Sequence, residues 1–262
     1  MADNDGTRLL NSSPPPPDAR IAYGPDPNQF GELRLAKGRK PAALLMFIHG
    51  GYWRARYDLT HAGHLCAALA PAGAATLNIE YRRVGNAGGG WPGTFDDIAA
   101  AARYIQQNTK LLASQYHIDA TRLAVAGHSA GGQLALWLAA RESSIKAVAS
   151  LAGVNDLRRA WELHLSNDAV VELLGGTPQQ VAEHYAEADP IRMTIKARQV
   201  LVHGSEDAIV PPDFSSRYVQ DKSQRGEHAE LIELHGAGHF DVIDPQSTYW
   251  PKAQSALLSL FT

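Results

Sequence analysis

One serine in the sequence has neighbours spaced as is typical of nucleophilic catalysis. Ser129 lies in the pentapeptide GHSAG, with a glycine two positions before it and another two positions after it. An apolar run before the pentapeptide predicts a strand, and the periodicity after it predicts a helix over 130–141. A tight turn between the two would present the hydroxyl at a helix N-terminus, where free N–H groups favour an anion. The pattern therefore indicates that Ser129 is a nucleophile.

Such a serine needs a base and an acid that orients the base, and along the chain the expected order is serine, acid, histidine. The sequence GSED follows a predicted strand over 199–203 and supplies Asp207 and its neighbour Glu206. Spacing alone does not separate these two acids. Other acids in the same part of the chain are Asp213, Asp241 and Asp244.

The base is expected after the next predicted strand, over 229–234. That strand runs into HGAGH, which contains His235 and His239. Two glycines between these histidines give the loop the freedom to turn the second one inward. His203 is a further candidate, but it lies within a strand pattern and is expected to pack in the core. The residues therefore favour His239 as the base.

A second motif, HGGYW at 49–53, follows the fully apolar predicted strand 43–48. Consecutive glycines let the backbone approach a substrate and direct N–H groups at the oxygen that becomes negative during acyl transfer. The N–H of Ala130, directly after the serine, is the expected partner. The motif therefore predicts an oxyanion hole.

Further residues could bind substrate or a metal ion. The aromatic residues Trp53, Trp91, Trp161 and Phe240 could line a pocket for an aromatic group, although ordinary core packing is an equal alternative. His61 and His64 have a spacing that suits a metal, but the sequence offers no third ligand and the serine chemistry needs none. We therefore expect no metal and no other cofactor. Glu80 and Arg82 are expected to form a structural ion pair.

The elements that position these residues alternate between short apolar runs and helical patterns, which predicts an α/β fold. Several of the runs, such as 43–48, are apolar at every position, as expected for a mostly parallel central sheet with helices on both faces. The predicted strands are 32–36, 43–48, 74–79, 122–126, 147–151, 199–203 and 229–234. The predicted helices are 59–70, 95–108, 130–141, 212–220 and 246–260.

Length and local composition predict the domain organisation. The 262 residues suit one α/β domain, which we place at 21–262 after a flexible, proline-rich tail at 1–20. A long segment over 155–196 exceeds an ordinary connection and predicts a small helical lid over the site. Because this lid is short, we expect acyl chains of about six carbons or fewer.

Composition excludes several classes of partner. The net charge of −3 shows no basic stripe, so nucleic acid is an unexpected partner. No apolar run approaches the roughly 18 residues that a membrane span needs, and the N-terminus has no signal pattern, which predicts a cytoplasmic protein. The single cysteine, Cys66, excludes an intramolecular disulfide. The oligomeric state stays open.

With GHSAGG, HGGYW, GSEDAIVP and GAGHF in this order, the chain resembles the α/β-hydrolase superfamily over about residues 20–262. It is most similar to the esterase/lipase group with an HGG oxyanion motif, which includes the kynurenine formamidases. The resemblance implies an α/β-hydrolase fold. The site residues that it implies are the N–H groups of Gly51, Tyr52 and Ala130 as the oxyanion hole, Asp207 as the acid and His239 as the base.

Three hypotheses about function follow. The first is a serine carboxylesterase that acts on small or aromatic acyl esters through an acyl-enzyme. The second is an arylformamidase that hydrolyses N-formylkynurenine with the same residues. The third is a protein of this fold that binds a ligand without catalysis, which is disfavoured because every member of the expected triad has a candidate. In the first two cases the partner is a small-molecule ester or formamide.

Overall fold

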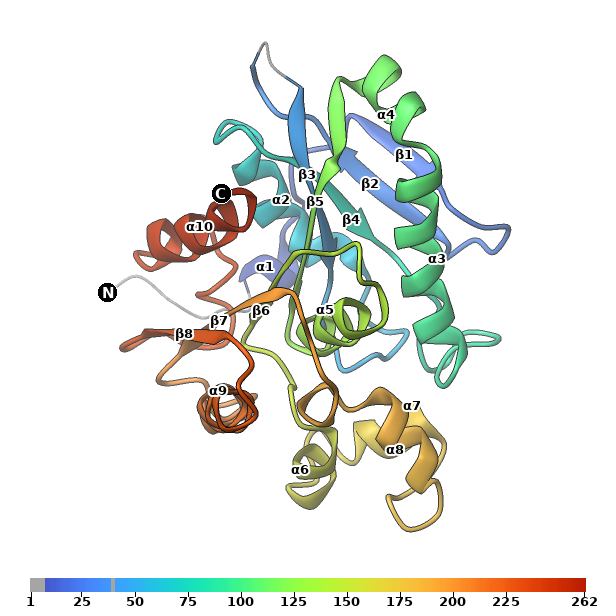
Figure 1. Ribbon diagram of the computed structural model, residues 1–262, viewed down its shortest axis with the longest axis vertical. Coiled ribbons are helices and arrows are strands. Elements are labelled where there is room, and N and C mark those ends of the chain that lie inside the picture. The colour runs from blue at the N-terminus through green and yellow to red at the C-terminus, as the bar shows by residue number, and fades with distance from the viewer. Residues whose placement is uncertain (1–7, 39–40) are drawn as a thin grey trace.

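The computed structural model describes residues 8–38 and 41–262, and these form one sheet of eight strands with helices on both sides (Figure 1). The strands are β1 (Ala19–Ala22), β2 (Phe30–Arg34), β3 (Ala42–Ile48), β4 (Ala75–Ile79), β5 (Ile118–His128), β6 (Ala147–Leu151), β7 (Arg198–Gly204) and β8 (Ala229–Leu234).

The strands lie in the order β1-β2-β4-β3-β5-β6-β7-β8. β2 pairs antiparallel with both β1 and β4, and all other neighbours are parallel. The loops that follow β3, β5, β7 and β8 therefore emerge at one edge of the sheet. This is the edge at which open α/β sheets bind ligands.

The alternation of side chains along β3 shows how the two faces are filled. Leu44, Met46 and Ile48 belong to the core on one side of the sheet, whereas Leu45 and Phe47 belong to the core on the other. The first side is covered by α3 (Gly93–Gln107), α5 (Ala130–Arg141) and α9 (Asp213–Gln224). The second is covered by α2 (Gly63–Leu69) and α10 (Trp250–Leu258). Helices bury both faces of the sheet at β3, which explains why this strand is apolar at every position.

The fold class is confirmed: the chain has a mostly parallel central sheet with helices on both faces. All seven predicted strands and all five predicted helices are present, with ends shifted by a few residues. The first predicted helix begins as the 3₁₀ helix η1 (Leu59–Ala62) before α2, and the last ends in η3 (Ser259–Phe261). The sequence patterns missed β1 and the helix α4 (Thr109–Tyr116).

The N-terminal segment differs from the prediction of a flexible tail. Residues 1–7 lie outside the described residues. Arg8–Asn11 form the short helix α1, whose Leu9 is fully buried, and β1 begins at Ala19 and pairs with β2. The side chain of Arg34 also donates a hydrogen bond to the carbonyl of Pro15 at 2.9 Å. These contacts hold residues 8–20 against the domain, because the apolar surface of α1 gains burial there.

The segment 155–196 between β6 and β7 is helical, as predicted. It contains α6 (Leu157–Glu162), α7 (Ala169–Leu174), α8 (Ala182–Ala188) and the 3₁₀ helix η2 (Pro190–Arg192). Figure 1 shows α6, α7 and α8 grouped at one end of the molecule, beyond the carboxyl ends of the strands. Among residues 8–38 and 41–262, no helix is long and apolar enough to cross a membrane.

Candidate active site

Ser129 lies in the tight turn between β5 and α5 that the sequence predicts, and its backbone conformation is strained. Its φ and ψ are 55° and −121°, and its residue surface is 2% exposed. The flanking glycines are required by close contacts: a Cβ on Gly127 would lie 2.0 Å from the carbonyl oxygen of Gly131. A Cβ on Gly131 would lie 2.1 Å from the carbonyl oxygen of Ile48, at the end of β3. The turn therefore tolerates only glycine at these two positions.

The predicted acid and base lie next to each other on the loops after β7 and β8. Nδ1 of His239 lies 2.7 Å from Oδ2 of Asp207, and both side chains are buried. Because a carboxylate can only accept, Nδ1 carries the proton and a neutral imidazole has Nε2 free to accept another. His239 and Ser129 line the same cavity.

Asp207 accepts four hydrogen bonds, which keep it ionised. The N–H groups of Ile209 and Val210 donate to Oδ1 at 2.9 and 2.8 Å. His239 donates to Oδ2, and Nε2 of His203 donates to the same oxygen at 3.1 Å. Burial alone would raise the pKa of the Asp207 carboxyl, but the hydrogen bonds from the two histidines outweigh it and hold that pKa well below its usual range. Of the acids considered, Asp207 is the one that contacts His239.

His203 is buried, as the sequence predicts, but it also contacts the acid, which the sequence did not indicate. Its Nε2 lies 3.0 Å from the carbonyl oxygen of Val210 as well as near Asp207, so this nitrogen carries the proton. Its Nδ1 accepts from the hydroxyl of Ser215 at 2.7 Å. The two contacts fix the ring and direct an N–H at the carboxylate.

Two other buried histidines line the same cavity as Ser129. Burial keeps the pKa of His128 well below its usual value, so this ring is neutral, and its Nε2 donates to the backbone carbonyl of His239 at 3.0 Å. Burial likewise lowers the pKa of His61 to about 3. His128 therefore links the serine turn to the loop that carries His239 without adding a charge there.

The predicted oxyanion loop lies against the serine. Gly51 and Tyr52 both have positive φ, at 111° and 51°, and both line the cavity that contains Ser129. A Cβ on Gly50 would lie 2.9 Å from Cβ of Ser129, which shows how closely the loop approaches. Ala130 is the first residue of α5, where N–H groups have no acceptor within the helix.

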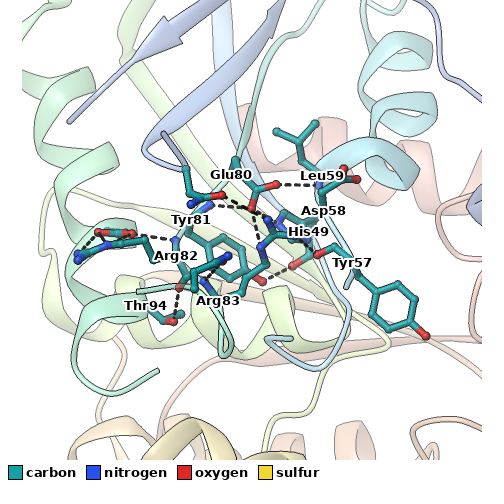
Figure 2. A network of polar contacts seen from close by, with 12 residues as sticks. His49, Tyr57, Asp58, Leu59, Glu80, Tyr81, Arg82, Arg83 and Thr94 are labelled. Atoms are coloured by element: carbon teal, nitrogen blue, oxygen red, sulfur yellow. Dashed lines mark hydrogen bonds and ion pairs between the residues drawn. The ribbon is translucent and has the colours of Figure 1, made fainter. Parts of the chain in front are cut away.

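A buried polar network fixes the start of this loop (Figure 2). Nε2 of His49 lies 3.0 Å from Oε1 of Glu80, and its Nδ1 lies 2.7 Å from the carbonyl oxygen of Gly50. The ring of Tyr81 stacks on His49 at 4.5 Å, and its hydroxyl donates to the His49 carbonyl at 3.1 Å. These contacts hold His49 and the start of the loop in place.

The predicted ion pair between Glu80 and Arg82 is wrong. Arg82 pairs instead with Asp97, at 2.6 Å, because that carboxylate is fully buried on α3 and lies within reach of the guanidinium. Glu80 pairs with Arg83 at 3.2 Å and with His49. Each of the two buried carboxylates therefore has an arginine guanidinium within 3.2 Å.

The cavity above Ser129 has a volume of about 210 Å³. Its lining has apolar and aromatic side chains and no side chain of Asp, Glu, Lys or Arg. The lining residues are Leu10, Gly51, Tyr52, Tyr57, His61, His128, Ser129, Ile209, His239 and Phe240. The sequence patterns did not single out Leu10, Tyr57 or Ile209, which reach the cavity only through the tertiary fold.

Only one of the four predicted substrate-binding aromatics lines this cavity. Phe240 does, but Trp53 is 1% exposed and its Nε1 donates to Oε1 of Gln133 in the core. Trp91 packs edge-on against Phe95, and Trp161 lies half-buried on α6. Core and insertion packing therefore account for the three tryptophans.

The insertion 155–196 contributes no residue to the lining of this cavity, which corrects the prediction that it covers the site. It is attached beside the site instead: the guanidinium of Arg54, just after the HGGYW segment, lies 2.7 Å from Oε2 of Glu172 on α7.

Within the described residues, no group of three or more His, Cys, Asp or Glu side chains could hold a metal ion.

Comparison with known proteins gives relatives that are esterases by name. Esterase LipC of Mycobacterium tuberculosis is 30% identical over 92% of this chain and 64% of its own length. A probable isoprenylcysteine alpha-carbonyl methylesterase of Oryza sativa subsp. japonica is 25% identical over 85% of this chain and 58% of its own length. The chain therefore spans less than two thirds of either relative.

Solved structures show the same fold. A truncated carbohydrate esterase from gut microbiota superposes with a TM-score of 0.79 at 22% identity, covering 95% of this chain and 99% of that one. Esterase B from Lactobacillus rhamnosis superposes with a TM-score of 0.77 at 18% identity, covering 98% and 89%. The family model BD-FAE matches residues 34–221, which is well over half of the sequence. The chain therefore belongs to the BD-FAE family, within the esterase group of α/β-hydrolases.

Proposed function

We propose that the chain is a serine hydrolase of the carboxylesterase type that acts on small or aromatic acyl esters. The observation that carries this proposal is that His239, which contacts Asp207 at 2.7 Å, lines the same cavity as Ser129, a serine with a strained backbone. The esterase names of the relatives support the same class of reaction.

In the proposed mechanism, Oγ of Ser129 attacks the acyl carbonyl while Nε2 of His239 accepts the hydroxyl proton. The carbonyl oxygen becomes negative and accepts hydrogen bonds from the N–H groups of Gly51, Tyr52 and Ala130. The tetrahedral intermediate collapses, the bond to the alcohol breaks, and His239 returns its proton to the leaving oxygen. Water then attacks the acyl-enzyme by the same route and releases the acid.

Asp207 has an electrostatic role in both steps. It remains an anion because hydrogen bonds hold its pKa low, so it stabilises His239 when the imidazole becomes positive. It also holds the proton on Nδ1, which leaves Nε2 unprotonated and able to accept the proton of Ser129. In the proposed mechanism, Ser129, His239 and Asp207 therefore supply the nucleophile, the base and the stabilising charge.

The cavity suggests the class of substrate. A volume of about 210 Å³ is below the range of roughly 300–1,000 Å³ that drug-sized ligands occupy, so the enclosed part of the substrate is small. The aromatic rings of Tyr52, Tyr57 and Phe240 in its wall suit an aromatic or short apolar group. The lining lacks charged side chains, which favours a neutral ester.

The same aromatic wall also suits an aryl formamide, so arylformamidase activity is the second candidate. A panel of p-nitrophenyl acetate, p-nitrophenyl butanoate, methyl benzoate, an acetylated sugar and N-formylkynurenine separates the two. We expect kcat/KM to be highest on a small or aromatic ester. Hydrolysis of N-formylkynurenine alone would replace the esterase proposal with the formamidase one, and no turnover of any member would contradict both.

A further inference from the structure

The short helix α1 supplies one wall of the substrate cavity. Leu10 on this helix lines the cavity, although it lies far before the nucleophile in the sequence. Among the described residues, only four large apolar side chains are strongly exposed, and two of them, Leu10 at 39% and Ile209 at 40%, border this same cavity. Exposed apolar side chains that gather around a catalytic serine indicate a surface that receives an apolar ligand.

Two polar contacts hold α1 across the cavity rim. At one end, the guanidinium of Arg8 pairs with the carboxylate of Asp244, four residues beyond Phe240. At the other end, Oγ of Ser12 lies 3.2 Å from Nε2 of His64 on α2. The helix therefore bridges the loop after β8 and the helix α2, with Leu10 between its two attachments.

A different contact joins two other parts of the cavity wall. The hydroxyl of Tyr52 donates to the carbonyl oxygen of Ile209 at 2.9 Å, which joins the oxyanion loop to the loop after β7. The insertion 155–196 supplies no lining residue. The lining side chains of Leu10, Ile209 and Phe240 could all be shortened without breaking a hydrogen bond, and Leu10 is the one of these three that lies on α1.

We propose that Leu10 is a specificity-determining residue that limits the length of the substrate group extending from Ser129 toward α1. This inference rests on the proposed esterase function and deepens it, since it assigns the size limit to α1 instead of the helical insertion. The group that Leu10 meets is neutral and apolar, because the nearby lining side chains of Phe240 and His61 carry no charge; burial keeps the pKa of His61 low.

The two obvious replacements have opposite expected effects. Leu10→Ala lengthens the apolar space, and each methylene that then gains a wall contact raises kcat/KM by a factor of up to about four. Leu10→Trp fills the space and excludes the longer chains. We expect the ratio of kcat/KM for octanoate over butanoate to rise about fivefold or more in Leu10→Ala and to fall about fivefold or more in Leu10→Trp.

The experiment uses the full chain and two ester series, one that varies the acyl chain on p-nitrophenol and one that varies the alcohol of an acetate ester. Leu111→Ala on α4 is the matched control, because Leu111 is 43% exposed and does not line the cavity. Opposite shifts for the alanine and tryptophan variants in either series support the proposal. Ratios within twofold of the wild type in both series would overturn it.

A second comparison tests the helix as a whole. Arg8→Gln removes the ion pair to Asp244, whereas Arg141→Gln removes an exposed ion pair to Glu187 far from the cavity. We expect Arg8→Gln to shift the ratio in the same direction as Leu10→Ala and Arg141→Gln to leave it unchanged. An unchanged ratio in Arg8→Gln, with the Leu10 effects intact, would contradict the bridging role of α1.

Labelling separates this inference from the proposed function. In a fluorophosphonate reaction Oγ of Ser129 displaces fluoride from phosphorus, so labelling needs the nucleophile but no natural ester. If the wild type hydrolyses no ester, the esterase proposal fails, and the ratio of labelling rates for octyl and ethyl fluorophosphonates still tests Leu10. Equal ratios in wild type, Leu10→Ala and Leu10→Trp would then refute the Leu10 proposal as well.

Discussion

Replacing Asp207 by asparagine should remove nearly all activity, and the hydrogen bonds around the carboxylate show why. The oxygen of the introduced amide is expected at the place of Oδ1, where the N–H groups of Ile209 and Val210 donate. The amide NH₂ then takes the place of Oδ2 and faces Nδ1 of His239. The reverse orientation leaves two backbone donors facing an NH₂ group, which costs about 1–3 kcal/mol for each one.

The favoured orientation places the proton of His239 on the wrong nitrogen. Nδ1 must accept from the amide, so the proton of the neutral ring moves to Nε2, which can then no longer accept the serine proton. His203 cannot accept the amide hydrogen in place of His239. Its Nδ1 already accepts from Ser215, so its Nε2, which faces the amide, keeps its proton. From the known effect of the wrong tautomer in serine triads, we expect kcat to fall by about 10⁴-fold, with KM little changed.

Steady-state hydrolysis of p-nitrophenyl acetate at neutral pH measures this effect. Asp213→Asn is the matched control, because Asp213 is a neighbouring acid that pairs with Arg159 and does not contact His239. Thermal unfolding of both variants shows whether they remain folded. If Asp207→Asn kept a tenth or more of the wild-type kcat, another acid such as Glu206 would have to orient the base, and the assignment of Asp207 would be refuted.

The other predictions concern pH and metal dependence. His61 keeps a pKa of about 3 when folded but about 6.5 when unfolded, so the wild type should lose up to about 1.4 kcal/mol of stability per pH unit below pH 6.5 relative to His61→Gln. Urea unfolding at pH 6.5 and pH 5 checks this, and parallel losses in both proteins would contradict it. Burial raises the pKa of Asp189 to about 7 in the folded protein, whereas the pKa is about 3.9 in the unfolded chain. The wild type should therefore lose stability relative to Asp189→Asn as the pH rises from 4 to 7. A difference in unfolding free energy between the two proteins that stays constant over this range would contradict the prediction. The proposed mechanism uses no Lewis acid, so EDTA should leave kcat unchanged, and loss of activity restored by a divalent ion would require a different mechanism.

The positions of Ser129, Asp207 and His239 relative to the sheet could be predicted from sequence because they depend on local constraints. The turn around Ser129 has room only for glycine at positions 127 and 131. The two glycines in the sequence motif therefore indicate this backbone geometry. Asp207 and His239 lie just after β7 and β8, which are parallel neighbours, and the carboxyl ends of parallel strands share one edge. The centre of the sheet was predictable because β3, β4 and β6 are buried at nearly every position and are therefore mostly apolar.

The walls of the cavity were not predictable, because they depend on contacts between distant segments. Leu10 belongs to a helix of four residues before a proline run, and nothing in its local pattern shows that Leu9 would be buried and Arg8 would pair with Asp244. A short helix gains its stability from tertiary packing more than from local propensity. The prediction of a flexible tail at 1–20 followed from composition alone.

Three of the four aromatic residues expected to bind substrate do not line the cavity, for a related reason. Trp53 follows the oxyanion glycines, but it points into the core and donates to Gln133. Trp161 belongs to an insertion that lies beside the cavity, and its helices pack on one another. A large aromatic side chain gains as much from a core as from a ligand pocket, so its type alone does not separate the two.

The central claim is that Ser129 is the nucleophile of an ester hydrolase, and one measurement tests it most directly. The kcat for p-nitrophenyl acetate is compared between wild type, Ser129→Ala and the exposed control Ser143→Ala, with fluorophosphonate labelling located by peptide mass spectrometry. We predict that Ser129→Ala stays folded, loses activity by about 10³-fold or more and takes no label, while the control matches the wild type. Near-wild-type turnover in folded Ser129→Ala, or a label on another residue, would contradict the account.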